Sequence, residues 1–99
     1  MKVKSTRKSV TKKYLFIDEN EKDVEVEFKF LALSTEQGER LRDSEAKDRL
    51  DVITKVMEEN LRGAEPYKSS LMSYLYSEGN VYEEYMNLLQ ELGKLNKDD

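Results

Sequence analysis

The chain has 99 residues with no cysteine, histidine or tryptophan, and its charged residues (38%) slightly exceed its hydrophobic ones (37%). This length fits one domain with a single modest core. The composition excludes zinc sites built from Cys and His, thiol chemistry, and catalysis by a His base or a Ser-His-Asp triad. No apolar run approaches the roughly 20 residues that span a bilayer, so we expect a cytoplasmic protein without membrane contact.

The first 13 residues are strongly basic, although the net charge of the chain is −4. They contain six bases and no acid, whereas the remaining residues contain 11 bases and 21 acids. We expect residues 1–9 to form a flexible basic arm. A nucleic-acid interface in this region would contact phosphates through Lys2, Lys4, Arg7, Lys8, Lys12 and Lys13. The cluster contains no aromatic residue for base stacking and the rest of the chain is acidic, so nucleic acid is the less favoured partner.

Residues 10–17 and 24–30 have the pattern of two β-strands. In the second segment, apolar and charged residues alternate, which is typical of a strand with one buried face. Its apolar positions are Val24, Val26, Phe28 and Phe30. The polar segment 18–23 predicts a turn, so the two strands should form an antiparallel hairpin. An isolated hairpin is barely stable in water, and the downstream helices must therefore cover its apolar face.

The predicted turn is acidic, with carboxylates at Asp18, Glu19, Glu21 and Asp23. Their spacing lacks the glycine at position six and the glutamate at position twelve of an EF-hand loop. We interpret the segment as a solvated hairpin tip, with a weak calcium or magnesium site as the alternative. No cofactor or metal is expected from this sequence.

A first helical region follows the hairpin directly. The capping-box pattern of Ser34 and Gln37 predicts that a helix begins there. Helical sequence then continues to about Leu61, with a break near Ser44, which would cap a second helix. Gly63 is placed to end that helix in a left-handed conformation.

Two further helices are predicted. One extends from about Pro66 to Ser77, since proline suits a first helical turn. Gly79-Asn80 ends it, and a regular apolar stripe then predicts a helix over residues 81–92. Gly93 should terminate this last helix, leaving residues 94–99 as a frayed tail.

This order of elements predicts a single α+β domain over residues 10–93, with an N-terminal antiparallel β-hairpin packed on three to four α-helices. The serines have no histidine to activate them, and the four glycines form no phosphate-binding loop. We therefore expect a protein that is not an enzyme.

Tyrosine is concentrated in the last third of the chain, which holds five of the six. Its large apolar body and polar tip are common at protein interfaces. The predicted partner-binding residues are Tyr74, Tyr82, Tyr85, Leu89 and Leu92. The alternative is that these side chains close a small core with their hydroxyls in water.

The passage from Phe28 to Gln37 resembles the small tail assembly chaperones of long-tailed bacteriophages. In that family an F-x-x-x-x-L-[ST] passage leads from a short hairpin into a helical body, and here Phe28, Leu33 and Ser34 occupy the pattern. The acidic body and helix-rich remainder are similar too. The resemblance implies a cytoplasmic, non-catalytic factor in virion morphogenesis. Such a chaperone binds the tape-measure protein, a long and largely helical chain, until tail-tube subunits polymerise around it.

Two other functions fit the sequence. The first is a small nucleic-acid-binding regulator that acts through the basic arm. The second is a self-assembling phage structural accessory protein, a homo-oligomer joined through hairpin edges or the tyrosine-rich surface.

Overall fold

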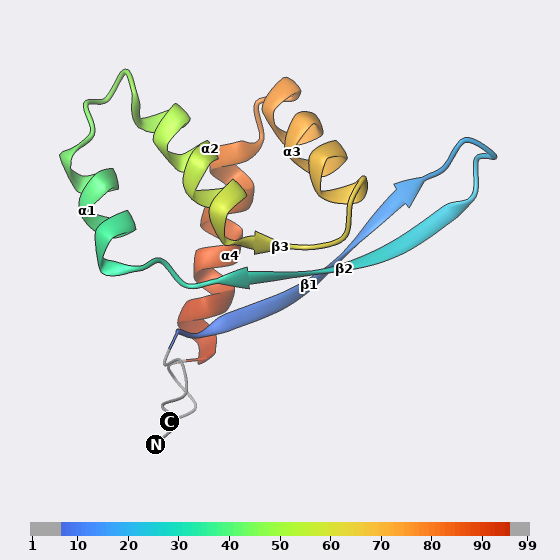
Figure 1. The fold of residues 1–99 in the computed structure, drawn as a ribbon, viewed down its shortest axis with the longest axis horizontal. Helices are drawn as coiled ribbons and strands as arrows, with labels where there is room; N and C mark the ends of the chain where they lie inside the picture. Colours follow the sequence, from blue (N-terminus) through green and yellow to red (C-terminus); the bar gives the residue numbers. More distant parts are fainter. Residues whose placement is uncertain (1–6, 96–99) are drawn as a thin grey trace.

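The structure is a computed structural model that describes residues 7–95. Two strands and a turn lead into four helices, with a short third strand between the second and third helices (Figure 1). The elements are β1 (Ser9–Ile17), β2 (Asp23–Leu31), α1 (Thr35–Asp43), α2 (Arg49–Asn60), β3 (Leu61–Arg62), α3 (Tyr67–Ser77) and α4 (Val81–Leu95). The predicted α+β fold is confirmed, with a three-stranded sheet in the order β1-β2-β3.

The hairpin is long, twisted and packed on one face only. β1 and β2 pair antiparallel without a bulge, and their acidic turn extends away from the helices (Figure 1). The predicted buried face is confirmed, because Phe28 and Phe30 are fully buried while the charged residues between the apolar positions are exposed. β3 pairs with β2 only at Lys29 and Phe30. Sequence patterning missed this strand, since Leu61 continues the apolar period of the preceding helix.

The helices supply the cover that the hairpin needs. Ile53 and Met57 from α2, Leu71 and Leu75 from α3, and Leu88 and Leu92 from α4 join the two buried phenylalanines in one core cluster. Because α1 contributes mainly polar contacts, three helices rather than four build most of this core. Leu50, which continues the predicted stripe of α2, is exposed in its first turn.

Gly63 has a different role from the predicted one. α2 ends at Asn60, and Gly63 is not among the residues with positive φ. Instead, the backbone at Gly63 lies against the ring of Phe28, and a Cβ atom there would be 2.1 Å from the ring carbons Cδ1 and Cε1. Glycine is required because the chain after β3 approaches the core aromatic too closely for any side chain.

The predicted helix ends are partly confirmed. The capping box is present: the Ser34 hydroxyl accepts a hydrogen bond from the Gln37 backbone, and the Gln37 side chain accepts one from the Ser34 backbone. The second cap at Ser44 is wrong, because Ser44 ends α1 and its hydroxyl donates to the Leu41 carbonyl over 2.6 Å. Gly93 does not stop α4, which continues to Leu95.

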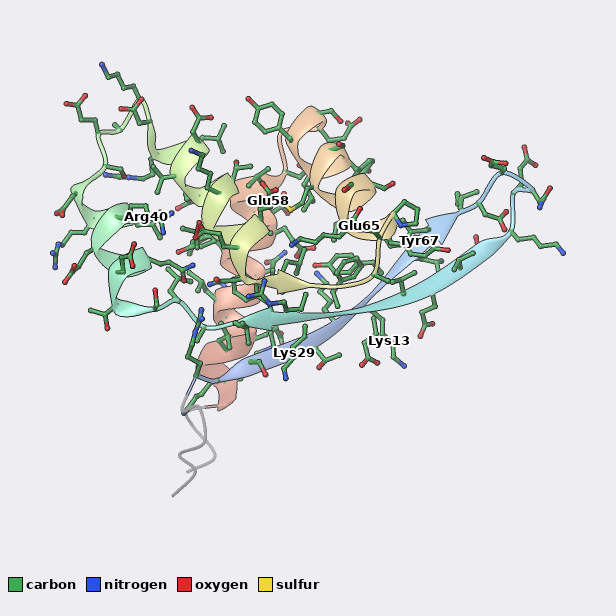
Figure 2. The ribbon with its side chains drawn as sticks, in the orientation of Figure 1. Lys13, Lys29, Arg40, Glu58, Glu65 and Tyr67 are labelled. Atoms are coloured by element: carbon green, nitrogen blue, oxygen red, sulfur yellow. The ribbon has the colours of Figure 1, made fainter. Side chains whose placement is uncertain are left out.

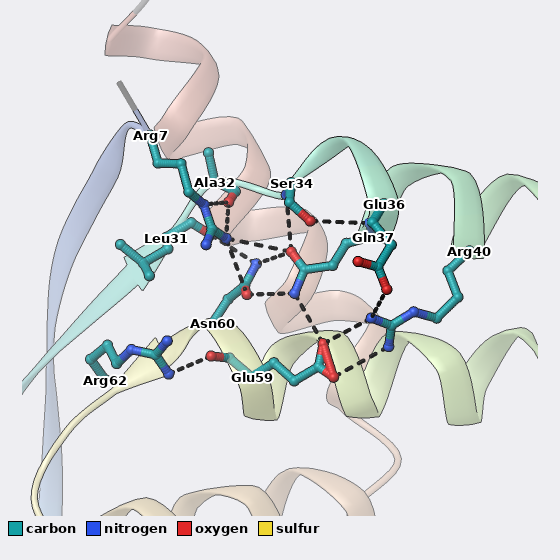
Figure 3. A network of polar contacts seen from close by, with 10 residues as sticks. All are labelled: Arg7, Leu31, Ala32, Ser34, Glu36, Gln37, Arg40, Glu59, Asn60 and Arg62. Carbon is teal, nitrogen blue, oxygen red and sulfur yellow. Dashed lines mark hydrogen bonds and ion pairs between the residues drawn. The ribbon is translucent and has the colours of Figure 1, made fainter. Parts of the chain in front are cut away.

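A buried pair of amides joins the two ends of this helical region (Figure 3). The Gln37 amide donates to Asn60 Oδ1 over 2.8 Å, and the Asn60 amide donates to Gln37 Oε1 over 2.9 Å. Asn60 also donates to the carbonyl of Leu31. The start of α1, the end of α2 and the end of β2 are therefore fixed to one another by mutually satisfied polar groups.

The described fold includes residues 7–9 of the predicted flexible arm. β1 already includes Ser9, and the Arg7 guanidinium donates to the carbonyl of Ala32 and to the Gln37 and Asn60 amide oxygens (Figure 3). Lys2 and Lys4 lie outside the described residues.

The core position of Phe28 generates a first prediction. Phe28→Ala should lower the free energy of unfolding by about 3–5 kcal/mol, because the side chain fills the centre of the core. Glu27→Ala, on the exposed face of the same strand, should change it by less than about 0.5 kcal/mol. Urea denaturation measures both, and equal effects would contradict the assigned face of β2.

The close contact at Gly63 generates a second prediction. Gly63→Ala should lower the free energy of unfolding by about 1–3 kcal/mol, since the new methyl group overpacks the Phe28 ring. The matched control is Gly38→Ala in α1, where a Cβ atom meets nothing within 4 Å. That change should raise stability by about 0.5–1 kcal/mol. A stabilising Gly63→Ala would show that the chain after β3 does not approach Phe28 so closely.

Candidate functional site

β1 is an edge strand whose outer side has no strand partner. At the two ends of the hairpin, Ala32 N–H donates to the Lys8 carbonyl over 2.8 Å and Asp18 N–H donates to the Lys22 carbonyl over 2.9 Å. In an antiparallel pair the direction of the backbone groups alternates from residue to residue. The N–H and C=O groups of the even-numbered residues of β1 therefore point toward β2. The free edge therefore presents the N–H and C=O groups of Ser9, Thr11, Lys13, Leu15 and Ile17.

A groove follows this free edge from end to end, which we call the β1-edge groove. It consists of three hollows that share lining residues. The proximal hollow lies between Val10–Lys12 and α4 residues including Asn87 and Glu91. The central hollow is bounded by Lys12, Tyr14, Leu75, Asn80, Glu83 and Glu84. The distal hollow lies between Tyr14–Ile17 of β1 and Ser70, Leu71 and Tyr74 of α3.

The distal hollow is apolar and open to solvent. It has a volume of about 530 Å³, and no acidic or basic side chain lines it. Three of its large side chains are exposed: Leu15 at 64%, Ile17 at 74% and Tyr74 at 60%. A concentration of exposed apolar side chains beside a hollow marks an interaction surface more often than a site of chemistry.

The central hollow is built around a half-buried ion pair. Lys12 Nζ lies 2.6 Å and 2.9 Å from the two carboxylate oxygens of Glu84, and 5.0 Å from the centre of the Tyr14 ring. Glu84 is buried, so the pair connects β1 to α4 in a partly dry environment.

The Tyr14 hydroxyl beside this pair is buried without a hydrogen-bond partner of ordinary geometry. Burial is the main factor that raises its pKa well above the usual range, and the nearby Glu84 carboxylate raises it further. Tyr14 is therefore neutral throughout the physiological range and serves as a wall of the groove.

The predicted partner-binding residues do not form one surface. Tyr74 lines the groove and Tyr82 is exposed on α4, but Tyr85 and Leu92 are core residues and Leu89 is half-buried. The prediction that Tyr85 and Leu92 face a partner is wrong. Both complete the apolar stripe by which α4 packs on the sheet.

The residues of β1 that line the groove were missed. The available signal was Tyr14-Leu15-Phe16-Ile17, four consecutive apolar residues without the alternation seen in β2. Such a run gives a strand two apolar faces. In this fold the helices cover only the face of Tyr14 and Phe16, so Leu15 and Ile17 remain exposed.

The basic residues predicted for nucleic-acid binding are dispersed. Lys12 projects toward the helices and binds Glu84, whereas Lys13 projects from the opposite face of the hairpin, 3.3 Å from Glu25 (Figure 2). Arg7 belongs to the amide network. Within the described part of the chain, these side chains do not share one basic surface.

Neither a metal site nor a membrane span is found among residues 7–95. No group of three potential metal ligands occurs there, and the Asp18 carboxylate instead accepts backbone hydrogen bonds from Asn20 and Lys22 within the turn. None of the described helices has the length and apolar character needed to cross a bilayer.

Comparisons with protein-family models, curated proteins and solved structures gave no match for this chain.

The Tyr14 hydroxyl generates a third prediction. Tyr14→Phe should raise the free energy of unfolding at pH 8 by about 1 kcal/mol, because it removes an unpaired buried hydroxyl. In the unfolded chain tyrosine ionises near pH 10, whereas the folded pKa of Tyr14 is raised. Its neutral form therefore stabilises the wild type fully below about pH 10, and this contribution is lost as the pH rises further.

The advantage of the Phe variant should accordingly widen between pH 8 and pH 11 in urea titrations. Tyr85, whose pKa is also raised by burial, is present in both proteins and cancels in the comparison. A constant difference across this range would show that Tyr14 is solvated in the folded protein.

Proposed function

We propose that this protein is a non-catalytic protein-binding factor that holds a segment of a long, largely helical protein during phage tail assembly. The observation that carries the proposal is the β1-edge groove, where an open strand edge and the exposed side chains of Leu15, Ile17 and Tyr74 surround an apolar hollow. Removing this apolar surface from water gives a partner a driving force for association.

The arrangement favours a binding role over a reactive one. The distal hollow contains no acid or base to transfer a proton, and two of the three charged side chains of the central hollow, Lys12 and Glu84, neutralise each other. Catalysis by acids and bases needs such groups within reach of a substrate.

The specific role in tail assembly is supported by the resemblance at the hairpin-to-helix junction. A long amphipathic chain exposes apolar stripes and aggregates before its own partners arrive, so it needs a cover that binds reversibly. A small domain with an open apolar groove meets that need. Localisation in the cytoplasm of a host cell is part of the same proposal.

Self-association is the competing use of this surface. An open strand edge beside apolar side chains is suited to a second copy as well as to another protein. Nucleic-acid binding has no comparable feature, because the described basic residues point in different directions.

A fourth prediction tests the proposal by co-expression with the tape-measure gene product of the same genome. The protein should co-purify with that product and increase its soluble fraction. Absence of both effects would overturn the proposed function.

The two exposed tyrosines of α3 provide a matched control. Tyr74 lines the groove, and Tyr76 is equally exposed (58% against 60%) but lies two residues on, on another side of the helix. Tyr74→Ser should reduce co-purification, while Tyr76→Ser should leave it unchanged. Equal losses would place the binding surface elsewhere on α3.

A further inference from the structure

We infer that the β1-edge groove binds its partner as an added β-strand: an extended segment that continues the sheet at β1. The segment is apolar where it meets Leu71 and Tyr74 and carries a lysine or arginine where it meets Glu83. This inference rests on the proposed function and specifies how that function is carried out, since the bound segment is extended even if the rest of the partner is helical.

The backbone of β1 determines the conformation of the occupant. The N–H and C=O groups of Lys13, Leu15 and Ile17 point out of the free edge beside the distal hollow. An extended segment presents its own groups at the same two-residue repeat and satisfies them. A helix has its backbone groups bonded internally, so a helix in this groove would bury the β1 groups without partners, at a cost in free energy.

The free edge of β1 and the stretch of β2 that β3 leaves unpaired differ in how they are protected. The unpaired stretch of β2 carries Asp23, Glu25 and Glu27, and charged residues of this kind discourage strand pairing. The distal half of β1 has no charged residue between Tyr14 and Ile17. An added strand is therefore favoured at β1 and disfavoured at β2.

The side chains along the groove determine the chemistry of the occupant. The distal half is apolar, whereas the wall formed by α4 is acidic. Glu84 is neutralised by Lys12, and Glu91 by Lys94 at 2.9 Å. Glu83 has no basic partner among the described residues, so charge complementarity favours a basic residue of the bound segment at this point.

The same charges disfavour a second copy of the chain. Antiparallel pairing of two β1 strands about Leu15 would place Lys13 of each copy opposite Ile17 of the other. The basic half of each strand would then meet the apolar distal hollow instead of the acidic wall. A different protein segment fits the groove better than β1 itself.

A fifth prediction tests strand addition by amide hydrogen exchange on the full ¹⁵N-labelled chain. The probes are two capped synthetic peptides of alternating valine and threonine, one with lysine at its N-terminal end and one with lysine at its C-terminal end. In the free protein, the amides of Tyr14 and Phe16 should be protected, and those of Lys13, Leu15 and Ile17 should exchange fast. A saturating peptide should slow the last three by about tenfold or more.

Two methylated forms of each peptide are the matched probes, one methylated on the odd-numbered backbone nitrogens and one on the even-numbered nitrogens. Both keep every side chain, and each form has one edge that cannot donate to β1. The form whose methylated edge faces β1 should bind at least about tenfold more weakly than the unmethylated peptide, the loss expected for about one good hydrogen bond. Equal affinity of both methylated forms and the unmethylated peptide would overturn strand addition. So would binding that leaves the exchange of Lys13, Leu15 and Ile17 unchanged.

Two variants of one residue give an independent measurement. Leu15→Pro removes an N–H that faces the free edge, so the β1–β2 hydrogen bonds are retained, while Leu15→Ala removes the side chain alone. Proline should weaken peptide binding more than alanine does. Circular dichroism establishes that both variants are folded, and the methylated peptides test the same hydrogen bonds without altering the protein.

The outcomes separate the two proposals. Co-purification with the tape-measure product, without any binding of the peptides, would overturn strand addition and retain the proposed function. Peptide binding without co-purification would overturn the proposal that the partner is a tail-assembly protein, and would retain strand addition. Sedimentation that shows a dimer, with Lys13, Leu15 and Ile17 amides protected in the absence of peptide, would assign the edge to a second copy and overturn the inference.

Discussion

The contact of the Phe28 ring with the glycine backbone at residue 63 is the constraint on which the rest of the structure depends. The ring lies edge-on to Tyr14, with centroids 5.5 Å apart, and is 6.2 Å from Phe16, which in turn packs on Tyr67 of α3. Through these rings one buried side chain positions β1, β2 and the segment leading into α3. The groove exists because these aromatic contacts hold the hairpin beside α3 without closing the space along its edge.

Polar groups define how the helices are placed around this core. The reciprocal amide pair of Gln37 and Asn60 is buried and fully hydrogen-bonded. It fixes the position of α1 relative to α2 more than it adds to the net free energy of folding. On the other side of the molecule, the Lys12–Glu84 pair connects β1 to α4. A small core can tolerate these buried polar groups only because each has a partner close by, and moving one helix would leave several of them unpaired.

An open strand edge such as that of β1 can pair with other chains and aggregate, so folded proteins usually protect it. Charged side chains protect the corresponding stretch of β2, and Lys12 and Lys13 interrupt the proximal half of β1, but Tyr14 to Ile17 has no such protection. An apolar strand edge beside an apolar hollow is understandable in a protein whose partner covers it. The core is complete without a partner, which is compatible with the reversible binding that we propose.

The sequence by itself determined the α+β class, the hairpin, the buried face of β2 and the start of α1, because each depends on a local period or on a cap within four residues. It did not determine the roles of Gly63, Ser44 and Gly93, since a glycine or serine near a helix end has the same local signal whether it ends that helix, caps another or accommodates a distant ring. Nor did it identify the surface that we propose for partner binding. The run Tyr14 to Ile17 is apolar on both faces, and only the packing of α3 and α4 against one of them leaves Leu15 and Ile17 exposed while Tyr85 and Leu92 enter the core. Which apolar residues remain accessible is a property of the whole fold, because it depends on where distant elements leave surface uncovered.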